Sequence, residues 1–228
     1  TSIPNRVSAI DHMLLSNEAE KNRTGNPAAS VFPQTLIDRY KTTAPNNLDV
    51  IETDWLKELF TNSGLMQNHN IQVSTSTDKI NLLTSFSYLK QEGLIPNSSF
   101  EKYDIRINPE FKINDKFSLV SVLGYNSNKT VNPSTGSAEF IIRQAIGLPA
   151  IGAGKFGPGM YGNAAQSNNR NPLAMAEAAG TSVVNGSTML TRFGFNYKPI
   201  TGIEIEAYWG RQASNPYTKS FVKNADIY

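Results

Sequence analysis

Two glutamates near the end of the chain are the residue pair most open to a catalytic interpretation. Glu204 and Glu206 lie two residues apart in IEIEAYWGR, so they share one face of an extended strand. Carboxylates arranged as a pair carry out glycoside hydrolysis. A strand with one wet face produces the same spacing without any chemistry, and no further catalytic group accompanies the pair. We therefore assign no catalytic residue and expect that the protein is not an enzyme.

Two other motifs lack the context that ligand binding would need. Residues 152–157, GAGKFG, fit the G-x-G-x-x-G pattern of dinucleotide sites, which requires a strand before it and a helix after it. Pro149 stands in front of the motif and PGMYG follows it, so a flexible loop explains the glycines better. The chain has no cysteine, and its two histidines, His12 and His69, lie far apart in sequence. No metal site and no cofactor are predicted.

Three residues in the middle of the chain are candidates for contact with a substrate. Phe156 and Tyr161 belong to a segment rich in glycine, and each could stack on a sugar ring or pack within the loop. Arg143, in SAEFIIRQAIG, could meet an anionic group or pair with a neighbouring carboxylate. His69 lies beside two asparagines at the start of a strand, where a structural hydrogen-bonding role is the simpler interpretation.

The composition narrows the classes of protein that fit. Charged residues make up 18% of the 228 residues, and the net charge is +2, which gives no electrostatic case for nucleic acid as a partner. No apolar run approaches the length of a membrane helix, about 18 residues. Hydropathy plots are nearly blind to β-barrels, however, because alternating residues average out.

Alternation with a period of two governs the second half of the chain. In KYDIRINPEFKI, residues 102–113, apolar side chains occupy one parity and charged side chains the other. Such a strand has one apolar and one charged face. Pro109 cannot donate a hydrogen bond within a fully paired strand, and we expect a local bulge there.

The pattern divides the chain into five segments and predicts an all-β, antiparallel up-and-down fold. Short connections alternate with long ones, so all tight turns fall at one end of the sheet. Long loops on one side and short turns on the other are typical of outer-membrane barrels. The predicted segments are an extracellular loop with short helices at 1–66, four barrel strands at 67–128, a long extracellular loop at 129–186, a barrel hairpin at 187–212, and the start of the next extracellular loop at 213–228.

Two architectures fit the alternation, and the sequence leaves both open. In a transmembrane β-barrel the apolar parity faces lipid and the charged parity faces a wet lumen. In a soluble or surface-attached β-sandwich, for example a glycan-binding module, the apolar parity faces a second sheet. The barrel interpretation predicts as lumen-facing Lys102, Asp104, Arg106, Glu110, Lys112, Arg192, Glu204 and Glu206. It predicts as lipid-facing Tyr103, Ile105, Ile107, Phe111, Phe193, Phe195, Ile205 and Trp209.

The aromatic residues agree with the barrel. Phe111, Phe117 and Tyr197 are expected near the tight-turn ends of their strands. The aromatic residues expected near the long-loop ends are Tyr88, Tyr103, Tyr125 and Trp209. Two such groups resemble the aromatic girdles of a membrane barrel. Six strands leave a barrel with open edges, which lipid does not tolerate. Under this interpretation we expect the chain to be a segment of a longer barrel.

Several motifs resemble the SusC/RagA family of TonB-dependent outer-membrane transporters of Bacteroidota. The resemblance covers roughly residues 52–128, and its motifs are Thr53-Asp54-Trp55, Asn68-His69-Asn70, Tyr88 with Gln91-Glu92-Gly93, and Phe100 with Lys102, Tyr103 and Arg106. One departure is Ser74-Thr75-Ser76, where the family usually has two glycines. The resemblance implies a barrel of 22 strands, of which this chain would be an early portion without the plug domain.

What the resemblance implies for function is nutrient import across the outer membrane of a Gram-negative cell. A SusD-like surface lipoprotein would cover the substrate as a lid, and the TonB complex would act through the plug domain. Glycans are the usual cargo of the family, and peptides are the alternative.

Overall fold

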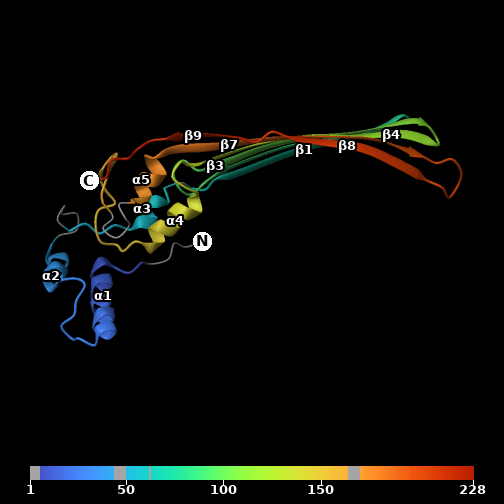
Figure 1. Ribbon diagram of the computed structural model, residues 1–228. Coiled ribbons are helices and arrows are strands. Elements are labelled where there is room, and N and C mark those ends of the chain that lie inside the picture. The colour runs from blue at the N-terminus through green and yellow to red at the C-terminus, as the bar shows by residue number, and fades with distance from the viewer. Residues whose placement is uncertain (1–5, 44–49, 62, 164–169) are drawn as a thin grey trace.

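A single antiparallel sheet dominates the computed structural model, which describes residues 6–43, 50–61, 63–163 and 170–228. Its strand order is β1-β2-β3-β4-β7-β8, and β9 also pairs with β7 (Figure 1). The strands are β1 (Met66–Ser76), β2 (Ile80–Glu92), β3 (Ser99–Asn114), β4 (Phe117–Pro133), β7 (Gly180–Tyr197), β8 (Ile205–Ser214) and β9 (Tyr217–Val222). The predicted all-β, antiparallel fold is therefore confirmed.

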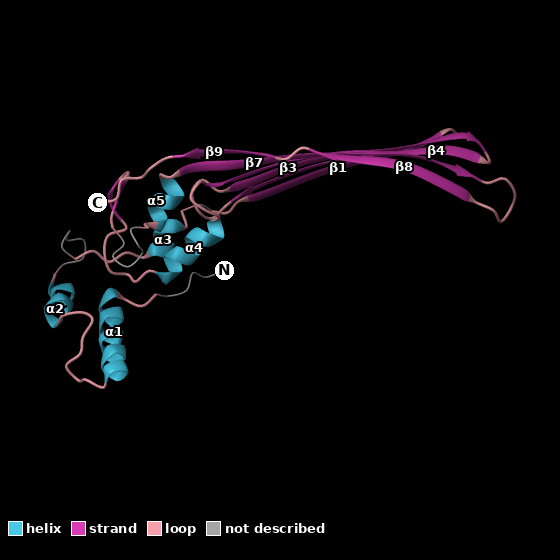
Figure 2. Ribbon diagram, in the orientation of Figure 1, coloured by secondary structure: helices cyan, strands magenta, loops and turns pink. Residues whose placement is uncertain are grey.

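The connections divide the sheet into two unlike ends. Residues 77–79, 115–116 and 198–204 join consecutive strands at one end, which we call the turn end. Residues 93–98 and 134–179 join strands at the other end, the loop end. Figure 2 shows the helices gathered at the loop end, while the turn end carries only short connections. The separation of short and long connections follows the sequence prediction.

Two strands extend further toward the loop end than the sequence indicated. β4 and β7 pair without interruption from Phe117↔Tyr197 to Pro133↔Thr181. The predicted boundaries at residues 128 and 187 were therefore wrong, and the long connection is shorter than expected. The polar stretch NSNKTV carries little apolar alternation, but its backbone groups are satisfied by the ladder with β7. Because of this extension, Tyr125 lies near the middle of β4 and not near its end.

A seventh strand lies in the segment that was expected to begin another loop. β9 pairs with the first part of β7, from Asn185↔Tyr217 to Gly180↔Val222, while β8 pairs with the last part. The Asn215 N–H donates to the Ser187 carbonyl oxygen at 2.9 Å between the two strands. β8 and β9 thus form one nearly continuous edge along β7, and the prediction for residues 213–228 was incomplete.

Pro109 is accommodated without a bulge. Ile107↔Leu123 and Glu110↔Val120 keep the same register on either side of it. The shift in the β3–β4 pairing occurs instead between Lys112 and Asn114, beside the tight turn. The bulge predicted at Pro109 was therefore wrong, because a missing N–H removes one hydrogen bond and leaves the spacing of the strand unchanged.

Five helices accompany the sheet in the described part of the chain. They are α1 (Ala9–Thr24), α2 (Gln34–Thr42), α3 (Trp55–Leu59), α4 (Ala138–Gly147) and α5 (Pro172–Glu177). Two of the helices begin at a capping side chain: the Ser8 hydroxyl accepts from the Asp11 N–H, and the Asp54 carboxylate accepts from the Lys57 N–H. A cap of this kind satisfies a donor that the first helical turn leaves unpaired.

The hydrophobic core lies at the loop end and not under the sheet. Helices α3, α4 and α5, with the small hairpin of β5 (Lys155–Gly157) and β6 (Met160–Tyr161), form a packed unit that we call the loop cluster. Its buried core consists of Trp55, Leu56, Leu59, Ile95, Ile141, Ala145, Leu148, Tyr161, Leu173, Ala174, Met175 and Ala176. The Trp55 indole N–H donates to the Pro149 carbonyl oxygen at 2.8 Å, which ties α3 to the chain that follows α4.

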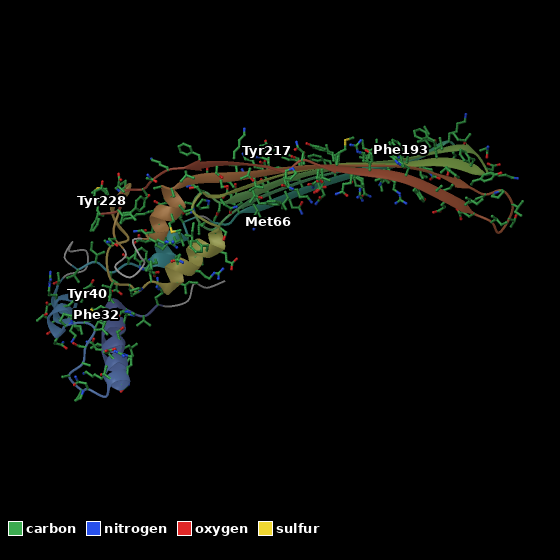
Figure 3. All side chains as sticks on the ribbon, in the orientation of Figure 1. Phe32, Tyr40, Met66, Phe193, Tyr217 and Tyr228 are labelled. Carbon is green, nitrogen blue, oxygen red and sulfur yellow. The ribbon has the colours of Figure 1, made fainter. Side chains whose placement is uncertain are left out.

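The long sheet carries no second layer among the described residues. Side chains project from both of its faces, and Phe193 lies along a stretch with no helix beside it (Figure 3). Ile105, Phe193 and Ile205 are 40%, 50% and 46% exposed. A β-sandwich would bury this parity under another sheet, so its expected packing is missing. No helix in the described ranges has the length and apolar character that would let it cross a membrane.

Asn171 is the polar group on which the loop cluster depends most. It is fully buried, and its amide donates to the carbonyl oxygens of Gly154 and Gly162 at 2.7 and 2.8 Å. Its side-chain oxygen accepts from the N–H groups of Leu173 and Ala174 and so caps α5.

Replacement of Asn171 by alanine removes the cap and the side-chain donor of two buried carbonyl oxygens, of which the Gly154 oxygen keeps the Gly162 N–H as a donor. We expect a loss of roughly 2–4 kcal/mol in the free energy of opening the loop cluster. Hydrogen exchange of the amides in α5 and β6 measures it. Asn26→Ala, at an exposed turn, is the matched control and should change that free energy by less than about 0.5 kcal/mol. Equal protection in both variants would contradict the assigned role.

Candidate functional site

The register of the sheet separates a polar face from an apolar face. Residues directly opposite one another in an antiparallel ladder share a face. Asp104 lies opposite Ser87 and Asn126, and Glu110 lies opposite Asn81. These polar neighbours define the polar face, and the residues between them define the apolar face.

The strand residues predicted as lumen-facing and as lipid-facing fall on opposite faces. The polar face holds Lys102, Asp104, Arg106, Glu110, Lys112, Arg192 and Glu206; the apolar face holds Tyr103, Ile105, Ile107, Phe111, Phe193, Phe195, Ile205 and Trp209. Glu204 precedes β8 and forms an ion pair with Lys198 at 3.1 Å, so it belongs to the turn end and not to a strand.

Charges on the polar face are paired or hydrogen-bonded at short range. The Lys102 Nζ lies 2.6 Å from the Asp104 carboxylate on the same strand. The Asn81 amide donates to the Glu110 carboxylate at 2.8 Å from the neighbouring strand. With charges of both signs and amides side by side, this face can form hydrogen bonds with water or with polar groups of a ligand or of another protein segment.

A hollow of about 670 Å³ lies over the polar face toward the turn end. Glu110, Asn108, Arg192 and Tyr208 are among its lining residues. The Arg192 guanidinium lies 3.8 Å from the centre of the Tyr208 ring, a cation–π contact that fixes the charge in place. The Tyr208 hydroxyl donates to the Glu206 carboxylate at 3.2 Å. The Asn108 side-chain oxygen, beside the hollow, is buried and has no hydrogen-bond partner among the described residues.

Aromatic side chains of the apolar face contact one another across strands. The Phe193 and Trp209 rings are stacked with centroids 6.5 Å apart, and those of Tyr88 and Tyr103 are 4.8 Å apart. Near the turn end, Phe117 lies 5.7 Å from Phe195. Phe193↔Trp209 are direct partners about midway along β8, so the position expected for Trp209 near the loop end was wrong within that strand.

The three candidate substrate-binding residues have different surroundings in the loop cluster. Phe156 is 42% exposed on β5. Tyr161 is only 4% exposed, and its hydroxyl donates to Glu177 at 3.0 Å. Arg143 is exposed on α4 and pairs with Glu139 at 2.8 Å. Phe156 is therefore the member of this set whose ring is accessible for stacking, and the Arg143 charge already has a carboxylate beside it.

A small polar network holds β5 and β6 against α5. The Lys155 Nζ lies 2.5 Å from one Glu177 oxygen, and Tyr161 donates to the other. Burial, followed by the hydrogen bond to Glu177, raises the pKa of Tyr161 to about 12. Burial also raises the pKa of Glu58, although the Lys155 charge nearby opposes that shift. The network is charged and half-buried, which favours a structural role.

Gly154 of the glycine-rich motif is closely packed, whereas Gly152 and Gly157 have only ordinary contacts beside them. A side chain at Gly154 would lie 2.7 Å from a Thr53 methyl carbon and 2.9 Å from a Leu173 methyl carbon. One at Gly162 would meet the Ala153 carbonyl oxygen at 2.1 Å. The glycines allow segments distant in sequence to approach, and they cradle no nucleotide.

The sequence analysis missed Tyr208 and Asn108 as members of the site. Both occupy the polar parity, and Tyr208 follows Glu206 by two residues, so alternation alone was the available signal. The contact with Arg192 depends on the β7–β8 register, which alternation does not give. In the described ranges, no group of three or more histidine, aspartate or glutamate side chains is arranged to hold a metal ion.

Comparison with known proteins finds similarity to two receptors of Formosa agariphila. TonB-dependent receptor P26 is 27% identical over 114 residues, which cover 50% of this chain and 10% of the receptor. TonB-dependent receptor P3 is 24% identical over 176 residues, which cover 74% of this chain and 17% of the receptor. The chain thus spans less than a fifth of the length of either relative. No protein-family model matches it.

The Tyr161–Glu177 contact predicts a specific response to alkaline pH. Because the pKa of Tyr161 is raised from 10 to about 12 in the fold, its protonated form stabilises the loop cluster below pH 10. That contribution is lost as the pH rises from about 10 to about 12. Tyr161→Phe should remove this part of the pH dependence and lower stability at neutral pH by roughly 1 kcal/mol.

Melting temperatures of the wild type and the variant between pH 8 and pH 12 provide the test. The difference between the two should shrink as the pH approaches 12. A difference that stays constant across this range would show that the hydroxyl proton does not couple to the fold.

Proposed function

We propose that this chain forms part of the barrel wall of a TonB-dependent outer-membrane importer. Similarity to two TonB-dependent receptors supports the assignment to a transporter and not to an enzyme. The observation that carries the proposal is the sheet with two unlike, uncovered faces. One face presents apolar side chains such as Ile105 and Phe193, and the other presents charges. In a membrane barrel the first contacts lipid and the second borders the lumen.

The border of the apolar face runs diagonally across the strands, as a tilted barrel requires. Tyr88 is the last aromatic residue of that face on β2, and Trp209 is the last on β8. Through the strand pairing, Tyr88 of β2 lies level with Tyr103 of β3, Ser127 of β4 and Ser187 of β7. On the edge strand, four strands away from β2, the residue at this level is Asn215. Trp209 lies six residues short of Asn215. Six residues are about 20 Å along a strand and four steps are about 19 Å across, which gives a tilt of about 45°.

The free edges of the sheet support a larger barrel. In the described strands, β1 pairs only with β2, while β8 and β9 pair only with β7. Unpaired backbone groups of an edge strand would cost several kcal/mol each in lipid. Further strands would satisfy both edges, which agrees with a segment of a 22-stranded barrel. Its loop end would face outward and its turn end the periplasm.

The finer assignment is import of the SusC/RagA type with a SusD-like surface lipoprotein as partner. The motifs of residues 52–128 support it, and the loop cluster would present Phe156 to a substrate or to the lid. Glycans are the favoured cargo because an exposed aromatic ring offers a stacking surface to a sugar; peptides are the alternative. Energy would reach the importer from the TonB complex through a plug domain.

Charge placed on the apolar face tests the membrane part of this proposal. Ile105→Arg puts a cation on the apolar face two residues inside the level of Tyr103 and should destabilise the reconstituted protein by roughly 1–2 kcal/mol. Arg106→Leu alters the neighbouring position on the polar face and should cost less than about 1 kcal/mol, because a wet lumen tolerates both residues. Denaturant unfolding in lipid vesicles measures both. If Ile105→Arg is harmless and Arg106→Leu causes aggregation, the two faces have been assigned the wrong way round.

Uptake by living cells tests the import part. Deletion of the gene should abolish uptake of one class of labelled oligosaccharide or peptide, and disruption of TonB should have the same effect. A surface lipoprotein should co-purify with the intact protein. Phe156→Ala should weaken glycan uptake severalfold, since loss of one stacking contact costs about 1 kcal/mol. Leu15→Ala, at an exposed position of α1, serves as the control, and normal uptake in the deletion strain would refute the assignment.

A further inference from the structure

Charged side chains on the apolar face are confined to its loop-end border. Within the described strands, this face carries the charged residues Lys90, Glu92, Glu101, Lys129, Arg211 and Lys219. On β2, β3, β4 and β8 they lie beyond the last aromatic residue of the apolar face, on the side toward the loop end, whereas on β9 Lys219 lies between Tyr217 and Phe221. Four of the six are basic. At the turn end, the strands place no charged residue on this face, so the two borders differ chemically.

Three of these residues form a row across neighbouring strands. Lys90 lies directly opposite Glu101, and Glu101 lies directly opposite Lys129. The hydroxyls of Tyr88 and Tyr103 both donate to one Glu101 oxygen, at 3.0 and 2.9 Å. The carboxylate is thus held by the tyrosines and flanked by two lysines. Lys90 and Lys129 are both exposed, and the row carries a net charge of +1.

Basic residues also follow aromatic residues at the opposite edge of the sheet, on β8 and β9. Arg211 follows Trp209 by two residues on β8, and Lys219 follows Tyr217 by two residues on β9. The Lys219 ammonium lies 5.8 Å from the centre of the Tyr217 ring. Aromatic residues followed by basic residues at a border of this kind are typical of the boundary between hydrocarbon and headgroups.

The depth of Lys90 in the membrane follows from the strand geometry. Two residues separate Lys90 from Tyr88, which is about 7 Å along the strand and about 5 Å along the normal at the tilt derived above. The headgroup layer on each side of a bilayer is roughly 5–8 Å thick. A lysine at this position therefore lies at the level of the headgroups and not of the acyl chains.

We propose that Lys90 and Lys129, with Arg211 further along the border, bind phosphate-bearing headgroups of the leaflet at the loop end. The proposal rests on the membrane placement of the proposed function and adds a lipid-binding site to it. An ammonium group attracts a phosphate as a point charge, and the tyrosine hydroxyls that hold Glu101 keep its carboxylate away from the approaching anion.

Retention of lipid by the purified full-length protein tests the site. The protein in detergent micelles is mixed with equal amounts of phosphatidylglycerol and phosphatidylcholine, and native mass spectrometry counts the retained molecules of each. The wild type should prefer phosphatidylglycerol, and the preference should fall as salt rises. Lys90→Gln and Lys129→Gln should each reduce the preference by about fivefold, the effect of one basic side chain at an anionic surface.

Two further variants sharpen the result. Glu101→Gln keeps an acceptor for the tyrosines and removes the negative charge, so the preference for phosphatidylglycerol should rise. Lys112→Gln makes the same charge change as the lysine variants on the polar face of β3 and should leave the preference unaltered.

The outcomes separate this site from the function that it extends. Equal retention of both lipids by the wild type, or an equal loss in Lys112→Gln and Lys90→Gln, would overturn the headgroup site while the barrel assignment stands. A protein that stays in solution without detergent and retains neither lipid would overturn both. Retention of a second protein at Lys90 and Lys129 in place of lipid would also overturn the headgroup site.

Discussion

The constant antiparallel register of the sheet is the constraint on which both surfaces of this protein depend. From β2 to β4 the ladder places the apolar side chains of Phe86, Ile105 and Tyr125 opposite one another, and it places Asp104 opposite Ser87 and Asn126. A slip by one residue would exchange the faces of a whole strand. The backbone pairing is long, with seventeen pairs between β4 and β7 alone. This ladder, and not a buried core, therefore gives the sheet its order.

The loop cluster, unlike the sheet, is held together by a buried apolar core. Its apolar side chains are buried against one another, and its interior polar groups are satisfied within the cluster. Thr53 illustrates this: its hydroxyl donates to the Gly152 carbonyl oxygen at 2.7 Å and accepts from the Gly154 N–H at 2.8 Å. Such packing fixes the shape of the segments that join the strands. A fixed loop loses less entropy on binding than a flexible one, so the cluster is suited to present a recognition surface.

Sequence reasoning was accurate where the signal was local and failed where it was not. Alternation placed Ile105 and Asp104 on opposite faces of the sheet. The polar extensions of β4 and β7 were not predicted, because pairing between the two strands stabilises them and no local sequence pattern reveals that pairing. Strand β9 was not predicted for the same reason. Tyr161 was read as a loop aromatic, but whether such a ring is exposed or buried depends on contacts with residues distant in sequence, here Glu177 of α5.

The sequence by itself determined the alternation of the strands, the assignment of side chains to two faces, and the order of short and long connections. Each of these follows from neighbouring residues and the geometry of an extended chain. Only the tertiary structure decided that no second sheet covers the apolar face in the described part of the chain, and that Lys90, Glu101 and Lys129 form one row. It also decided that the Arg192 guanidinium lies against the Tyr208 ring. These features depend on which strands pair and in which register, and that choice is made by contacts between segments far apart in the chain.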